Sequence, residues 1–350
     1  MDPLLLIIQL LLGALGILGV ATGEPGLAVD HGLRFLAAFL LTVLVSRIKP
    51  TSVVRYSPAA YVGVLALLGL VLIIGSSPEG SESKRWLLIG GISLQPSELM
   101  KVTVIAYLTA FFHNHLGDWQ IWRPMLVIGL AAGLIVVEPD VSTSAFLFAL
   151  AFAIMIAAGT SLARLVAIST AAAVIALLVA GSYLSQFEYI GERITGYQDL
   201  WGDQNEISST SYQAYQARDT LLRAGLFGIG PGRPNRVPES ETDMVAISIG
   251  QALGLVGLAT VIALFVLLAG RGIRVAASQS GPGSLLAAGA TTYICGQAAL
   301  NLLVASGLFP VTGIPLPFMS YGLNSLVSVS VAMGFIQSAY RHARETGALT

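Results

Sequence analysis

The chain has few charged residues and a single cysteine. Only 11% of its 350 residues are Asp, Glu, Lys or Arg, whereas a soluble domain carries about 25%. Together with 55% hydrophobic residues and a mean hydropathy of +0.78, this deficit excludes an ordinary soluble protein and predicts an integral membrane protein. The net charge of −1 gives no electrostatic reason to expect nucleic acid as a partner. Cys295 has no second cysteine for a disulfide, so we expect it to be a small packing residue.

Apolar segments of membrane-spanning length recur along the chain. At about 1.5 Å per residue, about ten of them cover a hydrocarbon core of about 30 Å. The first follows Met1-Asp2-Pro3, which lacks the basic residues of a cleavable signal peptide, so we expect it to stay as a transmembrane helix. We therefore expect one all-α polytopic membrane domain over residues 1–350. The expected helices are 4–22, 33–48, 59–75, 97–112, 124–138, 145–158, 162–184, 244–270, 283–307 and 320–340.

The distribution of basic residues predicts the orientation of these helices. Cytoplasmic loops carry an excess of Lys and Arg, and the excess falls on the side that also holds both termini. Both termini are then cytoplasmic, and the large loop 187–243, between the seventh and eighth helices, is extracytoplasmic. Within this loop, residues 211–223 have helical composition and precede a glycine-rich stretch. The inner basic residues are Arg47, Lys49, Arg55, Arg123, Arg164, Arg271, Arg274, Arg341 and Arg344.

Asp243 stands where the large polar loop re-enters an apolar segment. It follows the run Pro238-Glu239-Ser240-Glu241-Thr242 and precedes the apolar stretch from Met244. An ionisable group at this border is costly unless it faces water, a partner or a metal. Asp243 is therefore the first candidate for a functional residue.

Other polar groups fall at the outer ends of the expected helices. Glu98 and Lys101 are three residues apart and hence on one helix face, where they form either a structural ion pair or the lining of a hydrophilic cavity. Arg85 beside Trp86 fits an interfacial anchor, and it also fits a fork donor to a lipid diphosphate. Asp140 caps the next helix or faces the same cavity. One water-accessible site on the outer side accounts for all of them.

A proline-rich segment near the C-terminus belongs to the same outer side. Residues 309–322 contain Pro310, Pro315 and Pro317, which impose an irregular backbone. Such backbone near a membrane is tolerated where it lines a cavity or is buried in protein. With Asn301 in the preceding helix, this segment adds a further set of polar groups on that side.

These motifs, in this order, resemble the SEDS family (shape, elongation, division and sporulation), which includes RodA and FtsW. The resemblance covers nearly the whole chain, and the early Asp2-Pro3 is closer to the RodA branch. The matching blocks are Arg85-Trp86 with Gln95-Pro96-Ser97-Glu98 and Lys101, Pro139-Asp140, Tyr212-Gln213 with Gly225-Leu226-Phe227-Gly228-Ile229-Gly230, Pro238-Glu239 with Thr242-Asp243, and Pro310-Val311-Thr312-Gly313-Ile314-Pro315-Leu316-Pro317 with Ser320-Tyr321-Gly322.

The chain departs from the family pattern at two places. Gln251-Ala252-Leu253-Gly254 replaces a motif that carries an acid, which is expected to alter the charge of the cavity. Gly322-Leu323-Asn324-Ser325 replaces a Gly-Gly-Ser-Ser motif, a change expected to affect helix packing more than chemistry.

The resemblance implies a peptidoglycan glycosyltransferase in the bacterial cytoplasmic membrane. It would polymerise lipid II into β-1,4 glycan on the outer face, for cell elongation and shape, beside a class B penicillin-binding protein. Asp243 matches the family's essential aspartate, as general base or as ligand of a divalent cation such as Mg²⁺. A lipid II flippase and a scaffold for the transpeptidase are the alternatives. The candidate substrate-binding residues are Arg85, Gln95, Ser97, Glu98, Lys101, Asp140, Arg193, Tyr212, Gln213, Arg218, Arg223 and Ser320.

The partner is expected to dock on the eighth and ninth helices, which flank Asp243. Small residues let helices approach closely in lipid. The small residues expected on this surface are Gly254, Gly257, Ala287, Ala288 and Gly289.

Overall fold

Helices make up most of the described chain, as the composition predicts. The computed structural model describes residues 1–76, 84–114, 120–170, 191, 209–233 and 237–349. The helices are α1 (Pro3–Gly23), α2 (Ala28–Val45), α3 (Pro50–Ile74), α4 (Pro96–Asn114), α5 (Trp122–Val137), α6 (Val141–Ala157), α9 (Ser209–Ala224), α10 (Val245–Ala277), α11 (Pro282–Ala305) and α12 (Leu323–Glu345), with a 3-10 turn at Pro25–Leu27.

The expected helices are found with three main differences. α3 begins at Pro50 and not at 59, and Pro58 lies inside the helix. The seventh, 162–184, is helical over residues 162–170 and otherwise lies outside the described residues. α10 continues to Ala277, past the expected end at 270. The added segment contains Arg271, which forms an ion pair with Asp2. Of the described helices, α1, α3, α10 and the stretch Pro25–Val45 are long and apolar enough to span a membrane. The helix expected at 211–223 is α9.

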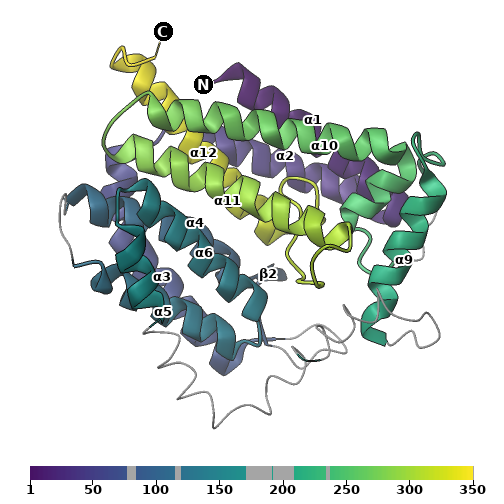
Figure 1. Cartoon of the computed structure of the whole chain (residues 1–350), viewed down its shortest axis with the longest axis horizontal. Helices are drawn as coiled ribbons and strands as arrows, with labels where there is room; N and C mark the ends of the chain where they lie inside the picture. Colours follow the sequence, from purple (N-terminus) through teal and green to yellow (C-terminus); the bar gives the residue numbers. More distant parts are fainter. Residues whose placement is uncertain (77–83, 115–119, 171–190, 192–208, 234–236, 350) are drawn as a thin grey trace.

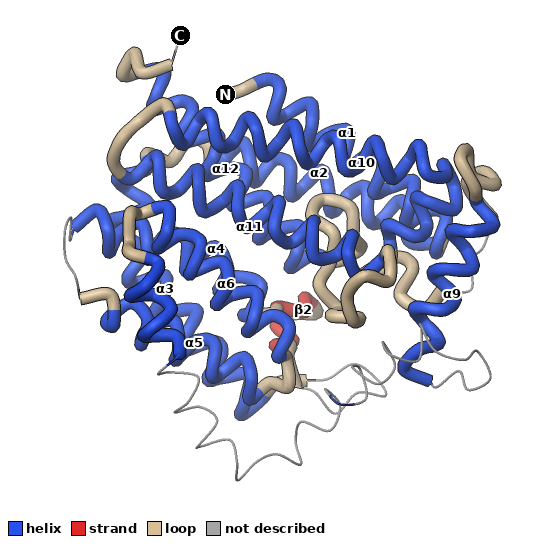
Figure 2. The backbone as a smooth tube through the Cα atoms, viewed as in Figure 1, coloured by secondary structure: helices blue, strands red, loops and turns tan. Residues whose placement is uncertain are grey.

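The helices form two groups that share α11 (Figure 1; Figure 2). α1, α2, α10 and α12 pack side by side, and α3 to α6 form the second group. α11 packs on α10 and α12 of the first group and on α4 and α6 of the second, so it lies at the centre. Both chain termini lie at one end of the bundle, whereas α9 lies at the other.

Asp2 ties the start of α1 to two other helices. Its carboxylate accepts hydrogen bonds from the backbone N–H groups of Leu4 and Leu5, which caps the helix. The same carboxylate lies 2.5 Å from Nε of Arg271 in α10. The backbone of Asp2 exchanges hydrogen bonds with the side-chain amide of Gln337 in α12. This pairing compensates the charge of Arg271 and explains why α10 continues through it.

A glycine joint connects the turn after α9 to α10. Gly254 has φ 68° and ψ −159°, which breaks α10. The turn supplies the missing acceptors, because the N–H groups of Leu255 and Val256 donate to the carbonyls of Gly225 and Leu226 (3.0 and 3.2 Å). A Cβ at Gly228 would lie 2.4 Å from the Ala252 carbonyl oxygen, so the two backbones touch directly.

The three glycines expected on the docking surface are instead buried against other parts of the chain. Gly254 is buried against the turn, and a Cβ at Gly257 would lie 2.4 Å from the Leu253 Cβ. Gly289 faces the side chains of Ile105 and Ile154 inside the bundle. These glycines serve packing within the chain and are not available to a partner.

A short hairpin, which the sequence analysis did not include, precedes α4. Strand β1 (Leu87–Ile89) pairs antiparallel with β2 (Ile92–Leu94) across Gly90-Gly91, both of which have positive φ. Two-residue turns of this kind favour glycine at both positions. The hairpin connects Arg85 and Trp86 to the start of α4, and all of these line one cavity.

Candidate active site

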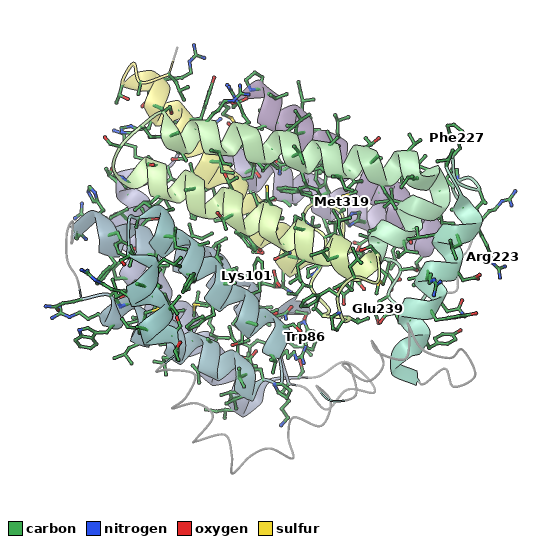
Figure 3. All side chains as sticks on the ribbon, viewed as in Figure 1. Trp86, Lys101, Arg223, Phe227, Glu239 and Met319 are labelled. Carbon is green, nitrogen blue, oxygen red and sulfur yellow. The ribbon has the colours of Figure 1, made fainter. Side chains whose placement is uncertain are left out.

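The predicted polar groups meet around one cavity of about 600 Å³. It lies among the hairpin, the starts of α4, α6 and α12, and the loops that precede α10 and α12. In Figure 3, Trp86 and Glu239 lie near this region, and Lys101 lies deeper among the helices. The predicted residues that line the cavity are Arg85, Gln95, Glu98, Asp140, Gln213 and Asp243.

Asp243 is held by its backbone while its carboxylate lies at the cavity wall. It is half-buried and comes two residues before the start of α10. The Nδ2 group of Asn301 in α11 donates to the carbonyls of Asp243 (2.7 Å) and Ile314 (2.8 Å). Gly313 lies against the carboxylate, since a Cβ there would be 3.4 Å from Asp243 Oδ2. These contacts fix the loop that carries the carboxylate at the cavity wall.

The loop that carries Asp243 contains a second acidic residue at the cavity. Glu239 has φ 56°, a conformation that costs energy for a residue with a Cβ. Its carboxylate accepts a hydrogen bond from Thr242 Oγ1 at 2.7 Å. The carbonyl of Thr242 in turn accepts from Ser320 Oγ at 2.7 Å, which links this loop to the proline-rich segment.

Glu98 and Lys101 form a buried ion pair beneath the cavity. Lys101 Nζ lies 2.6 Å from Glu98 Oε1 and 2.9 Å from Gln297 Oε1 of α11, and its side chain is fully buried. Glu98 reaches the cavity wall and accepts a second hydrogen bond from Ser328 Oγ of α12. Gln297 Nε2 also donates to the Pro315 carbonyl. The pair therefore connects α4, α11, α12 and the segment that supports Asp243.

Arg85 lies at the part of the cavity wall that the loop between α5 and α6 forms. Its Nε donates to the carbonyl of Glu138 (3.0 Å), and Nη2 donates to that of Pro139 (2.5 Å). Nη1 is 3.8 Å from the Asp140 carboxylate. Asp140 also caps α6 through a hydrogen bond from the Thr143 N–H, so both roles expected for it are met.

Helix N-termini add positive potential to the cavity. α4, α6 and α12 begin at residues beside the lining; Asp140 caps α6, whereas no side-chain hydrogen bond caps α12. The uncapped N–H groups and the helix dipole at the start of α12 favour anions. With Arg85, the arrangement suits a negatively charged group at this wall.

Several candidate residues do not line the cavity. Ser97 and Ser320 are buried beneath it, as Lys101 is. Tyr212, Arg218 and Arg223 of α9 are not among the lining residues, and Arg223 pairs with Asp219 at the surface. Arg193 lies outside the described residues. Direct contact with a bound diphosphate, expected for Lys101, Arg218 and Arg223, is not supported by this placement.

At both departures from the family pattern, Gln251 and Asn324, the structure differs from what the sequence predicted. Gln251 is buried, donates to the Arg233 carbonyl and lies in the glycine joint, so it does not set the charge of the cavity. Asn324 does line the cavity, and it bridges the Gln95 N–H and the Ser93 carbonyl. It therefore shapes the site directly.

Gln297, Tyr321 and Glu239 are site residues that the sequence reasoning missed. Gln297 is a polar residue four positions before Asn301 in an apolar helix, and this spacing could have revealed it. Tyr321 lines the cavity and donates to Asp30 of α2, a contact that no local pattern indicates.

An apolar cavity of about 620 Å³ adjoins the polar one. It lies between α6 and α11, and the two cavities share Val141, Ser142, Val311 and Thr312. Its other lining residues include Phe146, Leu150, Leu300 and Leu303. An elongated molecule with a polar head and an apolar chain could occupy both.

Known proteins resemble this chain over nearly its full length. It is 31% identical over 364 residues to the probable peptidoglycan glycosyltransferase FtsW of Coxiella burnetii, which covers 96% of this chain and 95% of that protein. It is 33% identical to the stage V sporulation protein E of Bacillus subtilis over 288 residues, 79% of this chain and 77% of that protein.

Solved structures share the fold. A chain of a peptidoglycan synthase complex that coordinates polymerization and crosslinking superposes with a TM-score of 0.78 at 23% identity, covering 97% of this chain and 98% of that chain. The rod shape determining protein RodA of Thermus thermophilus gives a TM-score of 0.70 at 22% identity, over 97% and 96% of the two chains. The family described as "Cell cycle protein", which comprises FtsW, RodA and SpoVE, matches residues 14–345. The chain therefore belongs to the FtsW/RodA/SpoVE family, the SEDS proteins, and is a polytopic membrane protein.

Proposed function

We propose that this chain is a peptidoglycan glycosyltransferase that polymerises lipid II into β-1,4 glycan at the outer face of the bacterial cytoplasmic membrane. The observation that carries the proposal is the pair of adjoining cavities. One holds several acidic side chains, among them Asp243, together with Arg85 and helix N-termini, and the other is apolar. Lipid II combines sugars, a diphosphate and a polyprenyl chain, which these features match in turn. The names of relatives such as the Coxiella FtsW support the same activity.

The proposed reaction uses Asp243 as general base. The 4-hydroxyl of an acceptor GlcNAc attacks the anomeric carbon of the donor, and its proton passes to the Asp243 carboxylate. The bond between that carbon and the phosphate oxygen breaks, and undecaprenyl diphosphate leaves with the bonding electrons. Attack opposite the leaving group turns an α-linked donor into a β-linked product. Arg85 and the N-terminus of α12 line the cavity, and in this proposal they stabilise the negative charge that develops on the departing diphosphate.

A divalent cation such as Mg²⁺ fits this site as an ion shared with the substrate. Among the described residues, no group of three or more His, Cys, Asp or Glu side chains could hold a metal. Mg²⁺ is commonly bound by one or two carboxylates together with substrate phosphates and water, and Asp243 would be the protein ligand. When bound, the ion would neutralise charge on the diphosphate.

The test of the proposed function is polymerisation of purified lipid II by the chain together with its cognate class B penicillin-binding protein. Glycan strands longer than the disaccharide are the expected product. Transfer of labelled lipid II across vesicles without polymer would favour the flippase. Partner-dependent crosslinking with no polymerase activity would favour the scaffold. The lining of the cavity supports the enzyme, because it stops at Glu98 and Ser325 and below it lies the fully buried Lys101.

We place the partner's transmembrane helix in a groove between α10 and α11. The groove encloses about 370 Å³ and is lined by small residues that include Ala269, Ala277, Ala288 and Ser284. It lies on the expected helices and includes the expected Ala288, but it does not include the expected glycines. Small residues at such a surface allow close helix approach in lipid.

Filling this groove should weaken the complex with the transpeptidase. Ala288→Leu is expected to reduce recovery of the complex in detergent about tenfold or more, because a larger side chain blocks close helix contact. Ala37→Leu on the exposed face of α2 is the matched control and should leave recovery unchanged. Equal recovery of both variants would place the interface elsewhere.

We propose that the chain serves the elongation branch, because its Asp2-Pro3 start is closer to that branch. Complementation tests the assignment, because a RodA-type chain should restore rod shape to cells depleted of RodA. Rescue of division in cells depleted of FtsW would reverse it.

A further inference from the structure

Glu138 is a buried carboxyl group next to the anion-binding wall. Only 1% of its surface is exposed, and neither carboxylate oxygen has a hydrogen-bond partner among the described residues. It does not line the cavity, although its neighbours Pro139 and Asp140 do. The reaction described above does not use it.

A carboxylate in this position is unstable as an anion. Removing an ionised carboxylate from water without a compensating partner costs several kcal/mol, and such groups take up a proton instead. Burial, and to a smaller extent the negative charge of Asp140, raises the pKa of Glu138 to about 8, and Arg85 opposes the shift. These are the charged groups of the described residues that act on it. At neutral pH the side chain is therefore a neutral acid.

The protonation state of Glu138 decides how many negative charges surround Arg85. The guanidinium is held by the carbonyls of Glu138 and Pro139 and lies 3.8 Å from the Asp140 carboxylate. With Glu138 neutral, Arg85 and Asp140 together carry no net charge. If Glu138 ionised, the cluster would carry one net negative charge at the wall that receives the diphosphate.

We propose that Glu138 is a positioning residue that stays a neutral acid so that Arg85 faces one carboxylate instead of two and keeps its affinity for the diphosphate of the substrate. The proposal rests on the proposed function for the identity of the ligand. It predicts that substrate binding weakens at alkaline pH, and that the catalytic step changes less than binding does.

The kinetic test compares wild-type protein with Glu138→Gln, each in nanodiscs with the cognate transpeptidase. For the wild type, we expect the KM for lipid II to rise about tenfold between pH 7 and pH 9, with a smaller change in kcat. Glutamine imitates the neutral acid, so Glu138→Gln should keep the low KM throughout. Glu24→Gln, at the exposed corner before α2, should behave as wild type. A rise in KM that persists in Glu138→Gln would overturn the proposal.

Two further measurements use the wild-type protein alone. They depend neither on polymerase activity nor on whether Glu138→Gln folds. Infrared spectroscopy of the wild type should show the carbonyl stretch of a protonated carboxylic acid at pH 7 that is lost by pH 9. Over the same range, binding of farnesyl diphosphate should weaken. The probe itself gains negative charge as the pH rises, which alone would strengthen its binding to Arg85. Absence of the infrared band at pH 7, or binding that does not weaken as the band disappears, would refute the proposal even if lipid II is not the substrate.

Discussion

Replacing Asp243 by asparagine is expected to lower the rate of glycan polymerisation by about 10²–10⁴-fold, which is the range for loss of a general base. Asparagine has almost the same shape but cannot accept the proton from the acceptor hydroxyl. The backbone contact from Asn301 to the residue-243 carbonyl does not involve the carboxylate. The fold should therefore survive. The measurement is the length and rate of polymer formed from lipid II.

The matched control for this change is Glu241→Gln. Glu241 lies in the same loop and carries the same charge, but it does not line the cavity. Its activity should stay close to that of the wild type. Wild-type polymer from a correctly folded Asp243→Asn protein would exclude both the base and the metal-ligand role for Asp243.

The Glu98–Lys101 pair should show strong coupling in a double-mutant cycle. Glu98→Gln leaves Lys101 buried without its counterion, and Lys101→Met leaves Glu98 in the same condition. Each single change should cost about 3–5 kcal/mol of unfolding free energy. The double variant should cost clearly less than the sum, because it leaves no unpaired charge. Unfolding in detergent, followed by tryptophan fluorescence, measures all four proteins.

The surface pair Arg341–Glu345 provides the comparison. Its atoms lie 3.2 Å apart, and both side chains are accessible to solvent. Exposed pairs contribute about 0–1 kcal/mol, so this second cycle should be nearly additive. Additive losses at Glu98 and Lys101 as well would show that the buried pair is not energetically coupled.

Most of the membrane fold could be predicted from the sequence because its physical signal is strong and local. A run of apolar residues long enough to span lipid identifies a helix without reference to the rest of the chain. The same logic found Asp243, since a carboxylate at the edge of such a run is conspicuous. The pairing of Glu98 with Lys101 followed from their spacing on one helix face.

The remaining site features depend on contacts between distant segments. Lys101 was expected either to pair with Glu98 as a structural group or to face substrate, and its contact with Gln297, almost two hundred positions away, goes with the buried structural role. Asn324 was expected to serve packing, whereas the hairpin brings Ser93 and Gln95 to it. Arg218 and Arg223 were grouped with the site because they share its loop, yet neither lines the cavity. The spacing of residues along the chain does not predict contacts between such distant segments.

The glycine joint between the turn after α9 and the break in α10 limits how parts of this protein can be exchanged with those of relatives. Gly225 and Gly228 contact backbone atoms of residues 252–255 directly, so neither side tolerates a partner with a different backbone path. A chimera that replaces only the outer loop would separate the two halves of the contact. Residues 209–256 should instead be exchanged as one segment, so that both ends of the exchanged segment lie outside the joint.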